Sequence, residues 1–124
     1  MLNLPSAVQL FACTRPIDMR KSFDGLAAAV EGYLGKEPMD GHVYCFFSRN
    51  GHHLRLLWWD RDGWMLLAKR LERGRFQMPW ALRTGDDRDP VPPCWNLDAD
   101  DLAAILHGVD LRSVKKLPRW RPGA

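Results

Sequence analysis

Apolar residues fill every second position, and several of the positions between, in two neighbouring stretches, His42–Ser48 and His53–Trp59. Alternation with a period of two is typical of β-strands. Asn50-Gly51 lies between the stretches and favours a tight two-residue hairpin turn. The turn predicts a register that gathers six apolar residues on one face of the sheet: Phe47 opposite Leu54, Cys45 opposite Leu56, and Val43 opposite Trp58.

A third strand is predicted to follow a second turn, Asp60-Arg61-Asp62-Gly63, and to run from Trp64 to about Arg73. Its alternation divides the side chains between the two faces of the sheet. The first apolar face is continued by Met65, Leu67 and Leu71, and the opposite face carries Trp64, Leu66, Ala68 and Arg70.

The segment from Asp18 to Leu34 has the apolar spacing of an amphipathic helix, with steps of three and four residues. Asp18 is its predicted N-cap, because a carboxylate accepts hydrogen bonds from the free amides of a first helical turn. Gly35 is the predicted end of the helix. A strand at Ser6–Thr14 is expected before it.

The C-terminal part predicts a short edge strand at Val91–Leu97 and a helix at Asp98–His107 capped by Asp98. Gly74–Pro93 reads as a loop with a brief apolar anchor at Met78–Leu82. We therefore expect an α+β fold, a single domain with an antiparallel β-meander of four or five strands packed with two helices. The domain is predicted to span residues 1–110, and residues 111–124 are predicted to be a basic, disordered tail.

The composition of the chain indicates its size class and its cellular compartment. The chain has 124 residues, enough for one modest core, and a formal net charge of +3. Its three cysteines lie far apart without a C-x-x-C pair, which argues against a disulfide scaffold and suits a reducing cytoplasm. The N-terminus lacks the pattern of a signal peptide, and the sequence has no apolar run long enough for a membrane span. A cytoplasmic protein without a membrane partner is expected.

The acidic and histidine residues do not form a pattern that predicts an active site. Each acidic candidate has a local explanation: Asp18 as a cap, Asp60 and Asp62 in a turn, and Glu72 between arginines. Adjacent His52 and His53 point to opposite faces of a strand and cannot easily chelate one ion. We therefore predict no enzyme, no catalytic residue, no metal site and no cofactor.

The best functional candidate is a local excess of basic residues. Between Arg55 and Arg75 there are six basic and three acidic residues. Arginine and lysine neutralise phosphates with little geometric demand, and arginine also binds carboxylates. The alternative is a solvated strand end in which Glu72 pairs with an arginine. Strand alternation places Lys69, Arg73 and Arg75 on one side and Arg70 on the other. The predicted contact residues for nucleic acid or an acidic partner are Arg61, Lys69, Arg70, Arg73 and Arg75.

Several ordered motifs together resemble a known family, the TnpB accessory proteins encoded by the second open reading frame of insertion sequence 66 transposons. The motifs are Asp18-Met19-Arg20-Lys21, Trp59-Asp60, Asp62-Gly63, Lys69-Arg70-Leu71-Glu72 and Gly74-Arg75-Phe76. The resemblance implies a non-catalytic helper of DNA transposition that works beside a separate transposase. It gives no established role to the motif residues Asp18, Arg20, Lys21, Asp60 and Gly63.

Two readings of that resemblance stay open. In the first, the chain binds transposon DNA, the cognate transposase, or both. In the second, it is purely a protein–protein interaction module with no DNA contact, and its basic edge meets an acidic face of the transposase or a second copy of the chain in a homo-oligomer. The absence of an evident DNA-binding helix motif favours the second reading.

Overall fold

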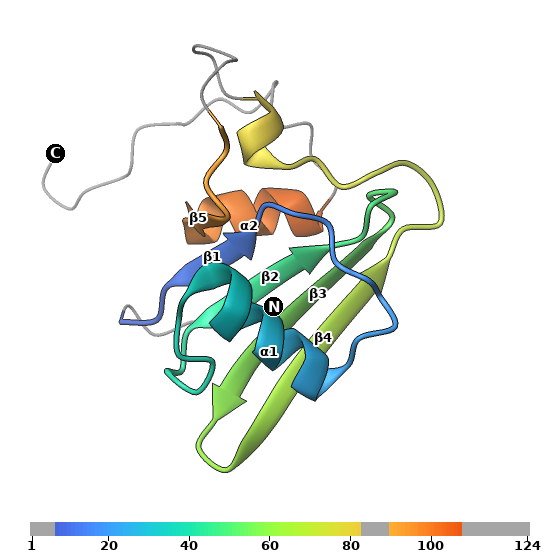
Figure 1. The fold of residues 1–124 in the computed structure, drawn as a ribbon. Coiled ribbons are helices and arrows are strands. Elements are labelled where there is room, and N and C mark those ends of the chain that lie inside the picture. Colours follow the sequence, from blue (N-terminus) through green and yellow to red (C-terminus); the bar gives the residue numbers. More distant parts are fainter. Residues whose placement is uncertain (1–6, 83–89, 108–124) are drawn as a thin grey trace, which may run out of the picture.

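The computed structural model of the protein describes residues 7–82 and 90–107. The predictions for the loop at residues 83–89 and for the basic tail at residues 111–124 lie outside this range. The elements follow the order β1 (Leu10–Cys13), α1 (Phe23–Leu34), β2 (Val43–Phe47), β3 (His53–Asp60), β4 (Gly63–Arg70), the 3-10 helix η1 (Pro79–Leu82), β5 (Cys94–Leu97) and α2 (Ala99–Leu106). The strands form one sheet in the order β4-β3-β2-β1-β5 (Figure 1).

The predicted α+β class is confirmed, and β2, β3 and β4 form the expected antiparallel meander. One strand pair departs from an all-antiparallel arrangement, because β1 pairs with β2 in parallel. The reason lies in the connection between them. A long crossover that contains α1 returns the chain to the same end of the sheet, so both strands run the same way.

The predicted register of β2 and β3 is confirmed at Phe47–Leu54 and Cys45–Leu56. The expected pairing of Val43 with Trp58 lies beyond the paired residues, which end at Tyr44 and Leu57. The turn itself differs from a two-residue Asn50-Gly51 hairpin, because the N–H of Gly51 donates to the C=O of Ser48 and the centre of the turn moves one residue earlier. The Asn50 side chain holds this longer connection, since its Oδ1 accepts from the Ser48 hydroxyl at 2.7 Å and the His52 N–H at 3.0 Å.

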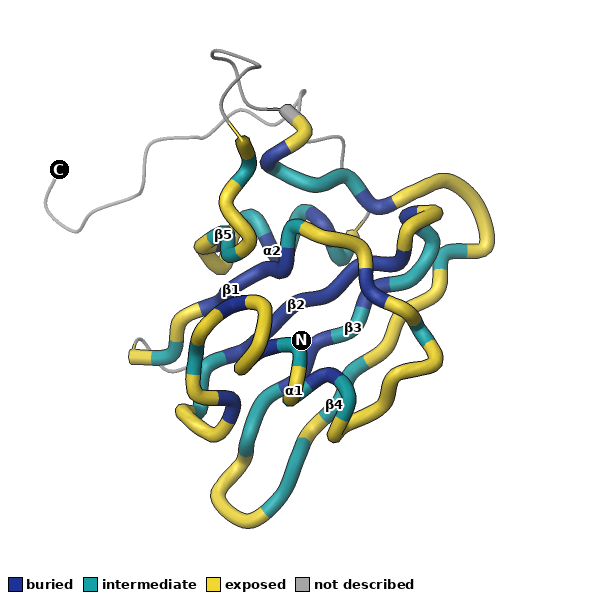
Figure 2. Tube along the Cα trace, viewed as in Figure 1, coloured by how far each residue is buried: buried dark blue, intermediate teal, exposed yellow. Residues whose placement is uncertain are grey.

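Helices cover both faces of the sheet, so that the molecule has three layers (Figure 1). On one face, α1 packs Leu26, Val30 and Leu34 against Tyr44, Phe46 and Leu57. On the other, α2 and η1 pack Leu102, Ile105 and Trp80 among Cys45, Phe47 and Leu56. All five residues of β2 are buried, which explains why this strand is apolar on both sides (Figure 2).

The start of α1 was predicted too early. The helix begins at Phe23 with Ser22 as its N-cap, and Asp18 caps no helix. Its carboxylate instead accepts from the backbone N–H and the guanidinium of Arg20, in a turn that precedes the helix. Gly35 ends α1 as predicted, with φ of +64° in the left-handed region.

The C-terminal elements agree with the sequence. β5 lies at the edge of the sheet, and Asp98 caps α2 through a capping box with Asp101. The predicted apolar anchor is η1, whose Trp80 is buried with its ring 5.7 Å from that of Phe47 and 6.1 Å from that of Trp95. This contact ties the segment after β4 back to the core.

We predict that Phe46→Ala lowers the free energy of unfolding by about 3–5 kcal/mol, because it empties a fully buried site beneath α1. Phe23→Ala is the matched control, since that phenylalanine is 40% exposed, and its cost should be about 1 kcal/mol or less. Urea unfolding followed by circular dichroism measures both. Similar losses in the two variants would contradict the assignment of the core.

Candidate functional site

The five predicted contact residues fall into two separate groups. Arg61 lies in the turn between β3 and β4, while Lys69 and Arg70 end β4 and Arg73 and Arg75 follow it. The strand β4 has eight residues, each rising about 3.3 Å, with the turn at one end and Lys69 and Arg70 at the other. Figure 1 shows this turn as the far tip of a hairpin that extends beyond the helices. The structure therefore does not bring Arg61 together with the other four residues.

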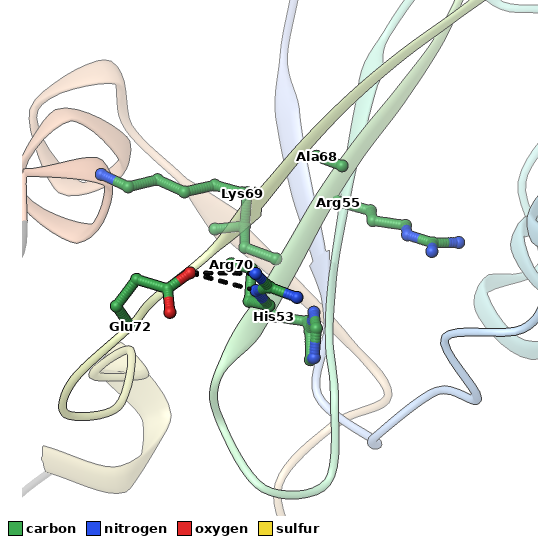
Figure 3. Close-up of a pocket in the computed structure, with 7 residues that line it drawn as sticks. His53, Arg55, Ala68, Lys69, Arg70 and Glu72 are labelled. Atoms are coloured by element: carbon green, nitrogen blue, oxygen red, sulfur yellow. Dashed lines mark hydrogen bonds and ion pairs between the residues drawn. The ribbon is translucent and has the colours of Figure 1, made fainter.

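An open depression of about 460 Å³ lies at the basic end of β4 (Figure 3). Its charged lining comes from two neighbouring strands, because His53 pairs directly with Arg70 and Arg55 with Ala68. Arg70 donates to Glu72 with an N–O distance of 3.0 Å. Both side chains of this pair are more than half exposed, so the ion pair contributes about 1 kcal/mol or less and opens readily to an external anion.

Lys69 and Arg70 point to opposite faces, as strand alternation predicted. The Lys69 ammonium donates to the C=O of Leu106 at the end of α2, and Figure 3 shows it directed away from Arg70 and Arg55. Part of the Lys69 side chain thus secures α2 to β4. Its charge is directed at the opposite side of the sheet from the Arg70 guanidinium.

The chain leaves the strand geometry after Arg70, so alternation does not place Arg73 and Arg75. The segment that carries them follows the β2–β3 connection instead: the N–H of Leu71 donates to His52, and the N–H of Phe76 donates to Gly51. The aliphatic part of Arg75 lies over Gly51, where an added Cβ would be 3.2 Å from the Cβ of Arg75. Arg73 and Arg75 are both exposed.

The turn before α1, which contains Asp18, Arg20 and Lys21, contacts Arg55, a residue that lines the depression. The Asp18–Arg20 pair closes the turn with an N–O distance of 2.6 Å, and the C=O of Lys21 accepts from the Arg55 guanidinium. Hydrogen bonds from Arg20 hold the pKa of Asp18 down at about 2. These contacts give the motif residues a structural role, namely to fix the turn before α1 and to orient Arg55.

Asp60 and Gly63 also have a local explanation. They form the last pair of β3 and β4 and so close the two-residue turn Arg61-Asp62. Arg61 has φ of +53°, a left-handed conformation that side chains rarely adopt. Its guanidinium approaches the carboxylate of Asp60 at 3.7 Å, and its side chain is 93% exposed.

Sequence reasoning did not select His53 and Arg55 as site residues. Their strand face was visible in the pattern, but their position beside Arg70 depends on the β3–β4 register. The predicted turn at residues 60–63 fixes that register, so pairing outward from Asp60–Gly63 was the signal that could have found them.

The described part of the chain offers neither a metal-binding group nor a reactive thiol. Within residues 7–82 and 90–107, no group of three histidine, cysteine or acidic side chains could hold a metal ion. Cys13, Cys45 and Cys94 are free thiols, and burial raises the pKa of each, which keeps them protonated and poorly nucleophilic. No helix within the same residues has the length and apolar character needed to cross a membrane.

The described residues form an α/β/α domain with an exposed basic strand end. The family description of IS66 Orf2-like proteins matches residues 8–116, and the chain belongs to this family. The family places the chain among the accessory proteins of insertion-sequence transposition, and it is not a known enzyme family.

Two relatives come from Sinorhizobium fredii. The uncharacterized protein y4hO is 35% identical over 121 residues, which cover 96% of each chain. The uncharacterized protein y4jC is 28% identical over 123 residues, which cover 98% of this chain and 97% of the relative. No solved structure shows a significant match.

We predict that the Asp18 carboxyl titrates with a pKa of about 2 and that Arg20→Gln moves this pKa part of the way back toward 3.8. Because the folded-state pKa is depressed, the pair stabilises the turn fully above the ordinary pKa of 3.8. That contribution is lost as the pH falls toward about 2. An NMR titration of the side-chain carboxyl carbon measures the shift, and an identical titration curve in the Arg20→Gln protein would refute it.

We also predict that Arg61→Gly raises the free energy of unfolding by about 1 kcal/mol, because glycine adopts the left-handed conformation without a steric penalty. Asp62→Gly is the matched control in the same turn. Its φ is not positive, so glycine there should lower the stability by about 0.5–1 kcal/mol through the greater freedom of the unfolded chain. Thermal unfolding compares the two; a loss of stability in both variants would count against strain at Arg61.

Proposed function

We propose that this protein is a non-catalytic accessory protein of DNA transposition that acts in the bacterial cytoplasm. It contacts the phosphate backbone of transposon DNA through the basic end of β4. The role in transposition is inferred from the family. The contact with DNA is inferred from the position of the basic residues. The observation that carries the proposal is the exposure of Arg70, Arg73 and Arg75 where β4 ends, beside an open depression that Arg70 lines.

The depression suits a phosphate more than a small organic ligand. It is open, and its lining includes His53, Arg55 and Arg70 beside the carboxylate Glu72, while the Lys69 ammonium is directed away from them (Figure 3). The Arg70–Glu72 pair is exposed, so a phosphate can replace the carboxylate at little cost. Arginine presents several N–H donors in a planar fork, which matches phosphate oxygens.

This surface contacts DNA without reading its sequence. None of the described helices carries a row of basic side chains suited to a major groove: the first turn of α1 contains Asp24, and that of α2 contains Asp100 and Asp101. Phosphate contacts fix position and supply affinity, whereas base-edge contacts supply sequence specificity. We therefore propose that the transposase, as a second partner, supplies the choice of site.

A protein-only role is the second candidate, and one observation favours it. Trp59 and Trp64 lie edge to face at the hairpin tip with ring centroids 5.0 Å apart, and both are partly exposed. Half-exposed tryptophans are typical of protein interfaces. In this reading the chain binds the transposase through the tip and has no contact with DNA.

We predict that the purified protein retards double-stranded DNA at low salt and that the combined substitution Arg70→Gln, Arg73→Gln and Arg75→Gln weakens binding. If the three cations each neutralise a phosphate, the slope of log K against log salt should fall by about 0.9 for each, or roughly 3 in total. Fluorescence anisotropy across a salt series gives both quantities.

Arg61→Gln is the control for that experiment, because it removes an exposed cation at the opposite end of β4. Its salt slope should equal that of the unmodified protein. Absence of any DNA binding at low salt by a folded protein, together with co-purification with the transposase, would select the protein-only role.

A further inference from the structure

The two edges of the sheet differ in how well they are protected from pairing with another strand. β5 has four residues and follows Pro92 and Pro93, so it is short and guarded by residues that cannot extend a ladder. β4 has eight residues, pairs with β3 in an unbroken register without a bulge, and contains no proline. Among the described residues, no strand occupies its outer side. Long, flat, unprotected edges are sites of strand addition.

The groups that β4 offers to a partner strand follow from its pairing with β3. The turn pair Asp60–Gly63 closes a two-residue hairpin, and the N–H of Leu71 donates to the C=O of His52. Hydrogen-bonded and non-bonded pairs alternate along an antiparallel ladder, so the odd-numbered residues of β4 bond to β3. The residues that present N–H and C=O groups to the outer side are Trp64, Leu66, Ala68 and Arg70.

We propose that β4 pairs antiparallel with β4 of a second copy of this chain, about a two-fold axis at Leu67. This register uses all four outward-facing residues, because they are spaced evenly about Leu67. Trp64 then lies opposite Arg70 of the second copy, and Leu66 lies opposite its Ala68. On the other face, Leu67 meets its own equivalent and Met65 lies opposite Lys69. The inference goes beyond the proposed DNA contact, because it concerns the outer edge of β4, and the two surfaces share Arg70.

The distribution of charge favours a second copy in this orientation. Along β4 the residues from Trp64 to Ala68 are uncharged, and the cations Lys69 and Arg70 stand together at one end. An antiparallel pair separates the cations of the two copies to opposite ends of the shared ladder, about 20 Å apart for the two Arg70 residues. It also places each Arg70 over a tryptophan ring, with Asp62 as a diagonal neighbour.

The apolar side chains of β4 become more buried in the proposed dimer. Met65 is 45% exposed although it lies on the face where Leu67 packs into the core. Opposite the aliphatic stem of Lys69 from a second copy, its thioether loses contact with water. The two five-stranded sheets become one continuous sheet, and each copy removes its long free edge.

Sedimentation velocity of the purified full chain over a range of concentrations tests the proposal. We expect a dimer that dissociates on dilution. Met65→Lys should weaken the dimer roughly tenfold, because two symmetry-related like-charge pairs with Lys69 appear at once. Met65→Glu should leave the dimer as tight or tighten it, since the same position then faces Lys69 with opposite charge. Met65 is exposed in the single chain, so both variants fold.

Two further variants test the β4–β4 pairing directly. Ala68→Pro removes an outward N–H but no hydrogen bond to β3, and it should give a folded monomer by circular dichroism and sedimentation. Leu67→Cys should form an intermolecular disulfide under mild oxidation, because facing residues of a non-hydrogen-bonded pair lie about 4.5 Å apart at Cα, within disulfide range. A chain that is monomeric at every concentration reached, or equal effects of Met65→Lys and Met65→Glu, would overturn the proposal.

Discussion

The burial of β2 on both faces is the constraint on which the rest of the fold depends. Its sequence, Val-Tyr-Cys-Phe-Phe, leaves neither side polar, so each face of the sheet requires a covering layer. The crossover α1 supplies one layer and makes β1 parallel to β2. The chain after β4 supplies the other through Trp80 and α2. Even the buried hydroxyl of Tyr44 is satisfied, since it donates to Asp40 at 2.5 Å and so holds the loop before β2.

That constraint also explains where charge is found. β1 and β2 carry no charged side chain, so the charges of the sheet lie on β3 and β4. β3 and β4 extend past the helices, and one end of this hairpin carries Arg70 beside His53 and Arg55 while the other carries Arg61. The result is a basic surface in an exposed setting, where each ion pair is weak and easily exchanged. Such a surface suits a helper protein more than an enzyme, which needs enclosed groups with shifted pKa values.

The sequence predicted the features that local physics determines. The register of β2 and β3 follows from the position of the turn signal Asn50-Gly51 between them, and the end of α1 follows from Gly35. The direction of β1 could not be predicted in this way, because alternation looks the same for parallel and antiparallel strands. The start of α1 was wrong because Arg20, two residues away, takes the Asp18 carboxylate that would otherwise cap a helix. The basic site was only partly visible, since its strand neighbours His53 and Arg55 come from the cross-strand register and not from adjacency in the chain.

The proposed DNA surface and the proposed pairing edge meet at Arg70, and this has a physical consequence. An Arg70 that lies over Trp64 of a second copy has left Glu72, yet its guanidinium keeps donors free at the rim of the depression. In the proposed dimer, the exposed cations Arg73 and Arg75 of each copy follow opposite ends of the shared β4 ladder. Phosphate affinity grows with the number of cations that engage one duplex, and linked sites bind with a raised effective concentration. Pairing and DNA binding would therefore reinforce each other, because the equilibrium that favours one raises the affinity of the other by the same factor.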